Sequence, residues 1–311
     1  MENQILGLHH VTAIASSAKK NYDFYTRVLG LRLIKKTVNF DDPKTYHLYY
    51  GDETGSAGTI LTFFPWEGMG AGRRGARQAT EIGLSVPEGS LDWWLDRLEK
   101  NNVIYNKPAE KFGEKYLTFL DPDGLKFELT VAKKKDDRKP WLTPEITAEH
   151  AIRGFHQITV TTNKIDKTAA VLTNIFGYRL LDKEVNRSRF VTDTVEQAAF
   201  IDLVEAPGEQ AGHVAAGSIH HVAFRLKDEQ TLLYYKDLIT AKGMNITEKI
   251  DRNYFYSLYF REPGGVLFEL ATENPGFTID EPLEELGMNL KLPSQYESKR
   301  AELENCLPKL N

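Results

Sequence analysis

Two segments of the chain repeat one another closely and limit the folds that it can adopt. FLDPDGLKFEL at residues 119–129 and FREPGGVLFEL at residues 260–270 share a turn, an apolar pattern and a final Phe-Glu-Leu, with Glu128 and Glu269 lying 141 positions apart. A Pro-Asp-Gly or Pro-Gly-Gly turn that leads into an apolar run is typical of a β-hairpin. The chain therefore contains at least two copies of one β-rich unit.

The starts of the units repeat as well and raise the expected number of copies to four. The starts read GLHHVTA from residue 7, ATEIGLSV from residue 79, GFHQITV from residue 154 and SIHHVAF from residue 218. Apolar residues at helical spacing follow each start, and a β-rich stretch follows them. Each unit is predicted to run strand, helix and about three strands. The predicted units span residues 1–66, 78–133, 153–205 and 217–273.

Units of this size cannot bury a sheet face alone, so they should pair into curved sheets around a cavity. This predicts an α+β fold built from four βαβββ modules. The charged segment KKKDDRKPW is expected to link a first half, residues 1–140, to a second half, residues 150–275. Residues 276–311 depart from the repeat, and a helix packed on the body is expected near their end.

Composition limits the partners and the metal ligands. The 311 residues carry a formal net charge of −5 with both signs mixed along the chain, so nucleic acid and anionic membrane surfaces are unsuited as partners. No apolar run approaches ~18 residues, and a cytoplasmic protein is expected. Cys306 is the single cysteine, which excludes an intramolecular disulfide and thiolate clusters. A small-molecule partner is expected, and any metal must use His, Asp or Glu.

Strand alternation separates the two members of each His-His pair, because neighbouring side chains point to opposite faces of a sheet. In HHVAFRL, Val222 and Phe224 share the apolar face, and His221 lies on the other. His10 and Thr12 lie opposite Val11 by the same rule. A single histidine on a strand is most often a hydrogen-bonded core residue, so the pairs alone do not establish a metal site.

Comparison of the four units distinguishes these histidines from ordinary core residues. The second position of the pair is histidine only in units one and four, as His10 and His221, whereas unit three has Gln157 and unit two has about Glu81. A third ligand is available in Glu269, because an ionised carboxylate in such an apolar strand is costly without a partner. Glu128 occupies the same motif in a unit that lacks the histidine, so Phe-Glu-Leu alone is a weak signal.

Two imidazoles and one carboxylate are the ligand set of non-haem Fe(II) oxygenases. A zinc hydrolase can use a similar set. The residue types therefore predict a metal site formed by His10, His221 and Glu269 without deciding which metal occupies it.

The chain resembles the vicinal oxygen chelate superfamily, which includes glyoxalases, bleomycin-resistance proteins and extradiol dioxygenases. It is most similar to the dichlorohydroquinone dioxygenase type and to the ring-cleaving dioxygenases of bacilli. The resemblance is carried along the whole chain by LHHVT, YHLYYGD, GSLDWWLDRL, RGFH, IHHVAF, PGGVLFE and the tail GFT…LGMNLKLPSQ. It implies iron ligation by His10, His221 and Glu269, pairing of unit one with unit four, and pairing of unit two with unit three.

The resemblance also implies a function. It implies Fe(II), a hydroquinone as substrate, O2 as co-substrate and cleavage of the ring beside a hydroxylated carbon with both oxygen atoms incorporated, in the detoxification or catabolism of aromatic compounds. A homo-oligomer is compatible with it. The polar residues around the metal would be His9, Thr12, His220, Arg252 and Tyr259. Of these, His220 and Tyr259 are suited to proton transfer and Arg252 to an anionic oxygen.

Three alternatives stay open at this stage. The catechol-cleaving branch takes its ligands from units three and four, where Gln157 argues against it. A glyoxalase-type isomerase adds a second carboxylate, but alignment of Gly58 with Gly265 places Thr62 opposite Glu269. A non-catalytic drug-binding protein has no need of the three ligands. The sequence assigns no role to His47.

Overall fold

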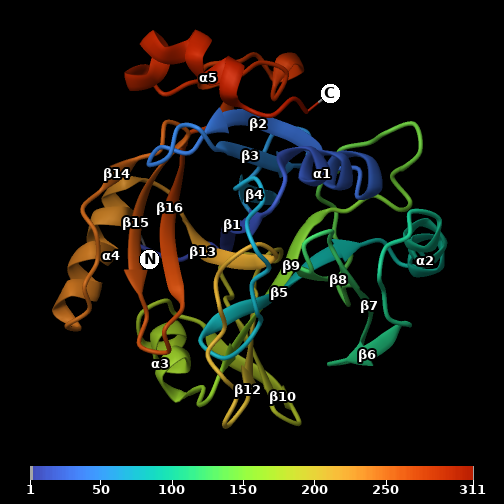
Figure 1. Ribbon diagram of the computed structural model, residues 1–311. Coiled ribbons are helices and arrows are strands. Elements are labelled where there is room, and N and C mark those ends of the chain that lie inside the picture. Colours follow the sequence, from blue (N-terminus) through green and yellow to red (C-terminus); the bar gives the residue numbers. More distant parts are fainter. Residues whose placement is uncertain (1–2, 311) are drawn as a thin grey trace.

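The computed structural model describes residues 3–310 and contains two curved eight-stranded sheets (Figure 1). The first sheet has the order β14-β15-β16-β13-β1-β4-β3-β2, and the second has the order β10-β11-β12-β9-β5-β8-β7-β6. The strands of the first sheet are β1 (Leu8–Ala15), β2 (Arg32–Val38), β3 (Tyr46–Gly51), β4 (Ile60–Pro65), β13 (Ser218–Leu226), β14 (Ile250–Asp251), β15 (Phe255–Arg261) and β16 (Leu267–Pro275). Those of the second are β5 (Gln78–Val86), β6 (Ala109–Lys111), β7 (Glu114–Leu120), β8 (Lys126–Val131), β9 (Gly154–Thr162), β10 (Arg179–Glu184), β11 (Arg187–Val191) and β12 (Phe200–Glu205).

The pairing of the modules confirms the predicted fold. β1 of the first module lies antiparallel to β13 of the fourth, and β5 of the second lies antiparallel to β9 of the third. Each sheet is therefore shared by two modules, one from each half of the chain. A site at the junction of β1 and β13 therefore combines residues more than 200 positions apart.

One helix follows the first strand of each module, as the apolar spacing predicts. The helices are α1 (Ala18–Asp23), which continues as a π-helical turn (Phe24–Val28), α2 (Leu91–Lys100), α3 (Asp166–Asn174) and α4 (Glu229–Ala241). In α4, Leu232, Tyr235 and Ile239 form one buried stripe, and this helix packs on β13, β15 and β16. The apolar faces of the strands that the helices cover are thus removed from water, and the polar faces line the interior of each curved sheet.

The C-terminal extension packs on the outer strand of the first sheet. It consists of short 3-10 turns at Phe277–Ile279, Leu283–Glu285 and Ser294–Lys299, followed by α5 (Arg300–Cys306), which lies above β2 in Figure 1. Lys35 of β2 is fully buried, and its ammonium donates to Asp280 at 2.6 Å and to Glu281 at 2.5 Å. A buried charge cluster thus attaches the extension to the sheet, and the expected C-terminal helix is present.

No helix within residues 3–310 is both long enough and apolar enough to cross a bilayer.

Candidate metal centre

The three predicted ligands come together on the inner face of the first sheet. His10, Ala223 and Glu269 occupy one row across β1, β13 and β16, and His221 lies two residues before Ala223 on the same face. The small Ala223 leaves space above β13 into which the longer side chains converge. The ligand atoms of His10, His221 and Glu269 all lie within 4.8 Å of one another, and all three residues are buried.

The arrangement fits a cation. The Nε2 atoms of His10 and His221 lie 3.0 and 2.8 Å from Oε2 of Glu269 and 3.4 Å from each other. Neither oxygen of Glu269 has a hydrogen-bond partner of normal geometry among residues 3–310. Burial alone would raise the pKa of Glu269, but the neighbouring His10 and His221 outweigh burial and hold this pKa well below its usual range. A buried, ionised carboxylate facing two imidazole nitrogens is a site at which a metal ion removes an energetic penalty.

The first histidine of each pair orients the second. Nδ1 of His9 lies 2.9 Å from Nδ1 of His10, and Nδ1 of His220 lies 2.7 Å from Nδ1 of His221. A metal ion bound at Nε2 of each ligand would leave the ring proton on Nδ1, from which it would donate to the neighbouring ring. Burial lowers the pKa of His9 and of His220 to about 3, so both rings are neutral at physiological pH and have a nitrogen that can accept this hydrogen bond. Such contacts fix the tautomer and direction of a ligating ring.

The position that would hold a fourth protein ligand is occupied by a threonine. Thr62 on β4 is in register with Thr12 on β1, and their hydroxyl oxygens are 2.8 Å apart. Thr62 also lies 2.9 Å from Nε2 of His47. A neutral hydroxyl with two hydrogen-bond partners takes the place of the second carboxylate expected of a glyoxalase-type isomerase.

A cavity of about 370 Å³ opens in front of the metal centre. His10, His221, Thr12, His220, Arg252 and Tyr259 line it, while His9 and Glu269 lie behind the lining. Nε of Arg252 donates to the hydroxyl of Tyr259 at 3.2 Å, and this pair stands on one flank of the cavity. All eight residues singled out from the sequence thus belong to this cavity or to the layer directly behind it.

Several lining residues were not singled out from the sequence. Phe255 packs against His9 and His10 with ring centroids 5.3 and 5.0 Å away, and it closes one side of the centre. His47 and Tyr49 lie two residues apart on β3, so both side chains face the cavity. The period-two pattern of TYHLYYG was the available signal for these two residues, but it does not say which face is internal.

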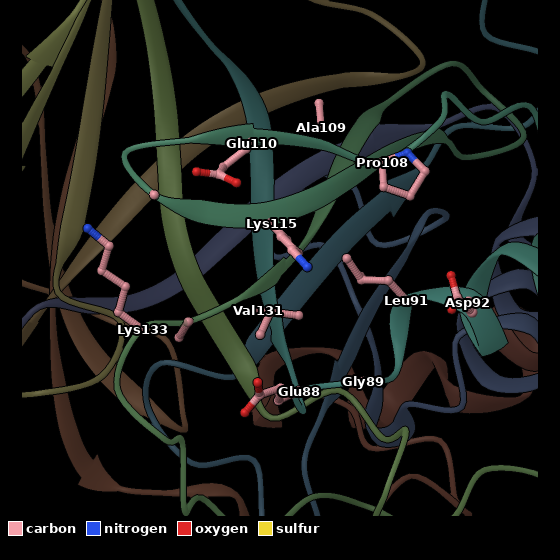
Figure 2. A pocket seen from close by; sticks show the side chains of 12 residues that line it. Glu88, Gly89, Leu91, Asp92, Pro108, Ala109, Glu110, Lys115, Val131 and Lys133 are labelled. Atoms are coloured by element: carbon pink, nitrogen blue, oxygen red, sulfur yellow. The ribbon is translucent and has the colours of Figure 1, made fainter.

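A surface hollow of about 800 Å³ lies away from this centre, between the start of α2 and the β6-β7 hairpin (Figure 2). Its ionisable side chains, among them Glu88, Glu110, Lys115 and Lys133, are exposed. No buried charged group lines it, so it offers no comparable chemistry.

In the second sheet, the positions that correspond to the three candidate ligands carry different side chains. Gln157, Gly83 and Glu128 form the row that corresponds to His10, Ala223 and Glu269, and Glu81 stands where His221 does. Gln157 donates to Glu128 at 2.5 Å. The Phe-Glu-Leu motif of the second module therefore does not mark a second site with the same ligands.

Cationic side chains compensate the buried carboxylates in the second sheet. Nζ of Lys111 lies 2.7 Å from Glu128 and 3.7 Å from Asp202. Lys111 precedes Arg252 by the same 141 positions that separate Glu128 from Glu269. Arg189 binds Asp202 at 2.8 Å and also contacts Glu114. Where the first sheet leaves a cavity, the second is filled by paired charges.

This network predicts an acid-sensitive core. Burial alone would raise the pKa of Glu81 and of Glu114. The pKa of Glu81 is instead lowered from 4.5 to about 2 by Arg187 and Lys126. The pKa of Glu114 is lowered to the same value by His156 and Arg189. Groups with a depressed pKa in the folded state stabilise it fully above about pH 4.5, and this contribution is lost as the pH falls toward 2. In urea unfolding measured between pH 7 and pH 3, the stability due to these groups should change little down to about pH 4.5 and fall more steeply below it. A Glu81→Gln variant should lose less stability than the wild type over that lower range; an equal loss would contradict the assignment.

Comparison with known proteins agrees with the module structure. The model of the Glyoxalase/Bleomycin resistance protein/Dioxygenase superfamily matches residues 7–129 and 154–270. The chain belongs to this superfamily. Over 307 residues it is 44% identical to a Bacillus subtilis (strain 168) protein named "Putative ring-cleaving dioxygenase MhqO", covering 99% of this chain and 97% of that one.

Two further relatives are similar over nearly the whole chain. The chlorohydroquinone/hydroquinone 1,2-dioxygenase of Sphingobium indicum is 36% identical over 313 residues, covering 97% of this chain and 96% of that one. A solved crystal structure of a "putative dioxygenase from Bacillus subtilis subsp. subtilis str. 168" superposes with a TM-score of 0.95 at 43% identity. The match covers 99% of this chain and 98% of that one. The likeness to these relatives thus covers both sheets and the C-terminal extension, whereas the superfamily model ends at residue 270.

Proposed function

We propose that this protein is an Fe(II)-dependent ring-cleaving dioxygenase that acts on hydroquinones and incorporates both atoms of O2. The observation that carries the proposal is the buried centre of His10, His221 and Glu269 with neutral Thr62 at the fourth position. Three protein ligands leave positions on the metal for substrate and O2. The named activity of the Sphingobium indicum relative supports a hydroquinone as the substrate class.

The chain's own residues would prepare the site in three ways. His10, His221 and Glu269 would hold the ion, and His9 and His220 would keep the two ligating rings in place. Phe255 and the surrounding cavity wall would exclude water from an aromatic ring bound in front of the centre. Iron in this site would supply a Lewis acid that brings an aromatic diol and O2 together and passes electron density between them.

Proton handling would fall to polar residues on the cavity wall. His220 lines the cavity and is partly exposed, so its imidazole would be within reach of a substrate hydroxyl and could exchange a proton with it. Burial raises the pKa of Tyr259 above its usual range, so its phenol stays protonated and can donate. Arg252 beside Tyr259 would stabilise negative charge that develops on a substrate oxygen. Thr12, next to the centre, would hold Thr62 and with it the polar wall.

The competing functions are less well supported. A catechol dioxygenase of the other branch would need a ligand at Gln157, whose amide is engaged by Glu128 in the second sheet. A glyoxalase-type isomerase would need a carboxylate at Thr62. A drug-binding protein without a metal would leave Glu269 buried and ionised with no cation. Detoxification or catabolism of aromatic compounds is the role that we propose for the reaction.

The direct test is oxygen consumption by reconstituted protein. After anaerobic loading with Fe(II), the protein should consume O2 with hydroquinone or methylhydroquinone, with one O2 taken up per ring cleaved. Catechol should be turned over more slowly. Absence of oxygen uptake by fully loaded protein with all three substrates would refute the proposal, and faster turnover of catechol would assign the protein to the catechol-cleaving reaction.

A further inference from the structure

A chain of hydrogen bonds crosses the cavity wall on the side of β4 and β3. It runs from Thr12 to Thr62 at 2.8 Å, from Thr62 to Nε2 of His47 at 2.9 Å, and from Nδ1 of His47 to the hydroxyl of Tyr49 at 2.9 Å. His47 and Tyr49 are buried and line the same cavity as the metal ligands. Polar groups therefore continue from the metal centre along one wall.

The second sheet indicates that these positions are not merely structural. Tyr49 is in register with Thr62, as Arg189 is with Asp202, and His47 and Arg187 each lie two residues earlier. In the second sheet these positions carry charges that bind one another and fill the interior, with Arg187 3.4 Å from Asp202. In the first sheet they carry neutral groups that satisfy one another and leave the cavity open. Neutral groups that face an open cavity are suited to an uncharged polar ligand.

The ring of Tyr49 is held rigidly from behind. It packs edge-on against Phe277 and Tyr254, with centroids 5.3 and 6.1 Å away. Tyr254 donates to Asp280 at 3.0 Å, and Asp280 accepts from the buried Lys35. The C-terminal extension thus fixes the Tyr49 hydroxyl in place before any ligand arrives, which is the condition for a selective hydrogen bond.

The Tyr49 hydroxyl has hydrogen-bonding capacity left for a ligand. Burial lowers the pKa of His47 and raises the pKa of Tyr49, so both groups are neutral. A neutral imidazole donates through one nitrogen and accepts through the other. In the tautomer whose Nε2–H donates to Thr62, Nδ1 accepts from the hydroxyl of Tyr49. Among the residues that the structure describes, this hydroxyl has no second partner, so its oxygen is free to accept one further hydrogen bond.

We propose that Tyr49 binds the second hydroxyl of the substrate, the one remote from the metal, and that His47 positions the Tyr49 hydroxyl to accept from it. This inference rests on the proposed function and adds the residues that would select a para-diol. β3 lies two strands from β1 in the first sheet, which corresponds to roughly 10 Å along the sheet at the usual strand spacing. A ring anchored at the metal through one oxygen can direct a para hydroxyl toward that wall. An ortho-diol keeps both oxygens beside the metal and makes no use of it.

The test compares two ligands that differ only in the group that Tyr49 would bind. The Fe(II)-loaded protein is titrated without O2 with hydroquinone and with 4-methylphenol, in which a methyl group replaces the second hydroxyl. Wild-type protein should bind hydroquinone about 10-fold more tightly, the value of one buried hydrogen bond of about 1.4 kcal/mol. Tyr49→Phe should abolish this preference and leave the affinity for 4-methylphenol unchanged. His47→Leu should reduce the preference, and His47→Gln, which retains hydrogen-bonding atoms, should restore part of it.

The matched control is Tyr50→Phe. Tyr50 is the next residue on β3, is equally buried, and donates to Asn21 at 2.9 Å on the other face of the sheet. This variant should keep the full preference for hydroquinone, with unchanged iron content. If wild-type protein prefers and cleaves hydroquinone but Tyr49→Phe keeps the preference, the assignment of Tyr49 is wrong while the proposed function stands. If iron-loaded wild-type protein neither binds nor cleaves hydroquinone, the proposed function fails and the assignment fails with it.

Discussion

Replacement of Glu269 by glutamine should weaken Fe(II) binding by at least about 100-fold and abolish oxygen consumption. Loss of a residue that only orients a ligand already costs about 10- to 100-fold in metal affinity, and Glu269 is the only anionic member of the ligand set. The amide that replaces the carboxylate is of similar size, so the buried strand β16 should keep its packing. The measurement is the dissociation constant and the stoichiometry in an anaerobic Fe(II) titration.

Glu128→Gln is the matched control, because the two glutamates occupy the same place in the two Phe-Glu-Leu motifs. It should leave one iron bound per chain with unchanged affinity, since Glu128 is engaged by Lys111, Gln157 and Thr130. A second ion per chain that disappears in Glu128→Gln would show that the second sheet also binds metal. Retention of wild-type affinity by Glu269→Gln would remove Glu269 from the ligand set.

The repeat was sufficient to predict the four βαβββ modules and to select His10, His221 and Glu269 as candidate metal ligands. Strand alternation placed His10 and His221 on an inner face, and comparison between modules separated them from Gln157 and Glu81. Both inferences depend on local periodicity, which a sequence displays directly. Pairing of the first module with the fourth does not follow from periodicity, and it was predicted only through the family resemblance.

The wall opposite the metal centre could not be predicted in the same way. The positions of His47 and Tyr49 depend on the register between β3 and β4 and on the C-terminal extension. Asp280 and Glu281 of the extension bind Lys35, which lies more than 240 residues earlier in the chain. Such contacts join segments that share no repeat. An isolated His-x-Tyr on a strand also reads equally well as ordinary core packing, so its neighbours in space had to be known first.

The ion pairs of the second sheet also could not be predicted from the sequence. They lead to the prediction with the largest expected effect on stability. Lys111→Met should lower the free energy of unfolding by about 3 to 5 kcal/mol, because it leaves the carboxylate of Glu128 buried without its cation. Methionine retains most of the volume of the side chain, so the loss reports on charge rather than on packing. Urea denaturation at neutral pH measures it.

The nearby Lys115→Met is the control for this prediction, since Lys115 is exposed on β7 and its loss should change stability by less than about 0.5 kcal/mol. The double variant Lys111→Met/Glu128→Gln should recover part of the stability lost in Lys111→Met, because it removes the charge that the first change leaves unpaired. Equal stability of Lys111→Met and wild-type protein would mean that Gln157 and Thr130 suffice to hold Glu128. In that case Lys111 would not be the group that compensates the buried charge of Glu128, as a metal ion would compensate Glu269 in the first sheet.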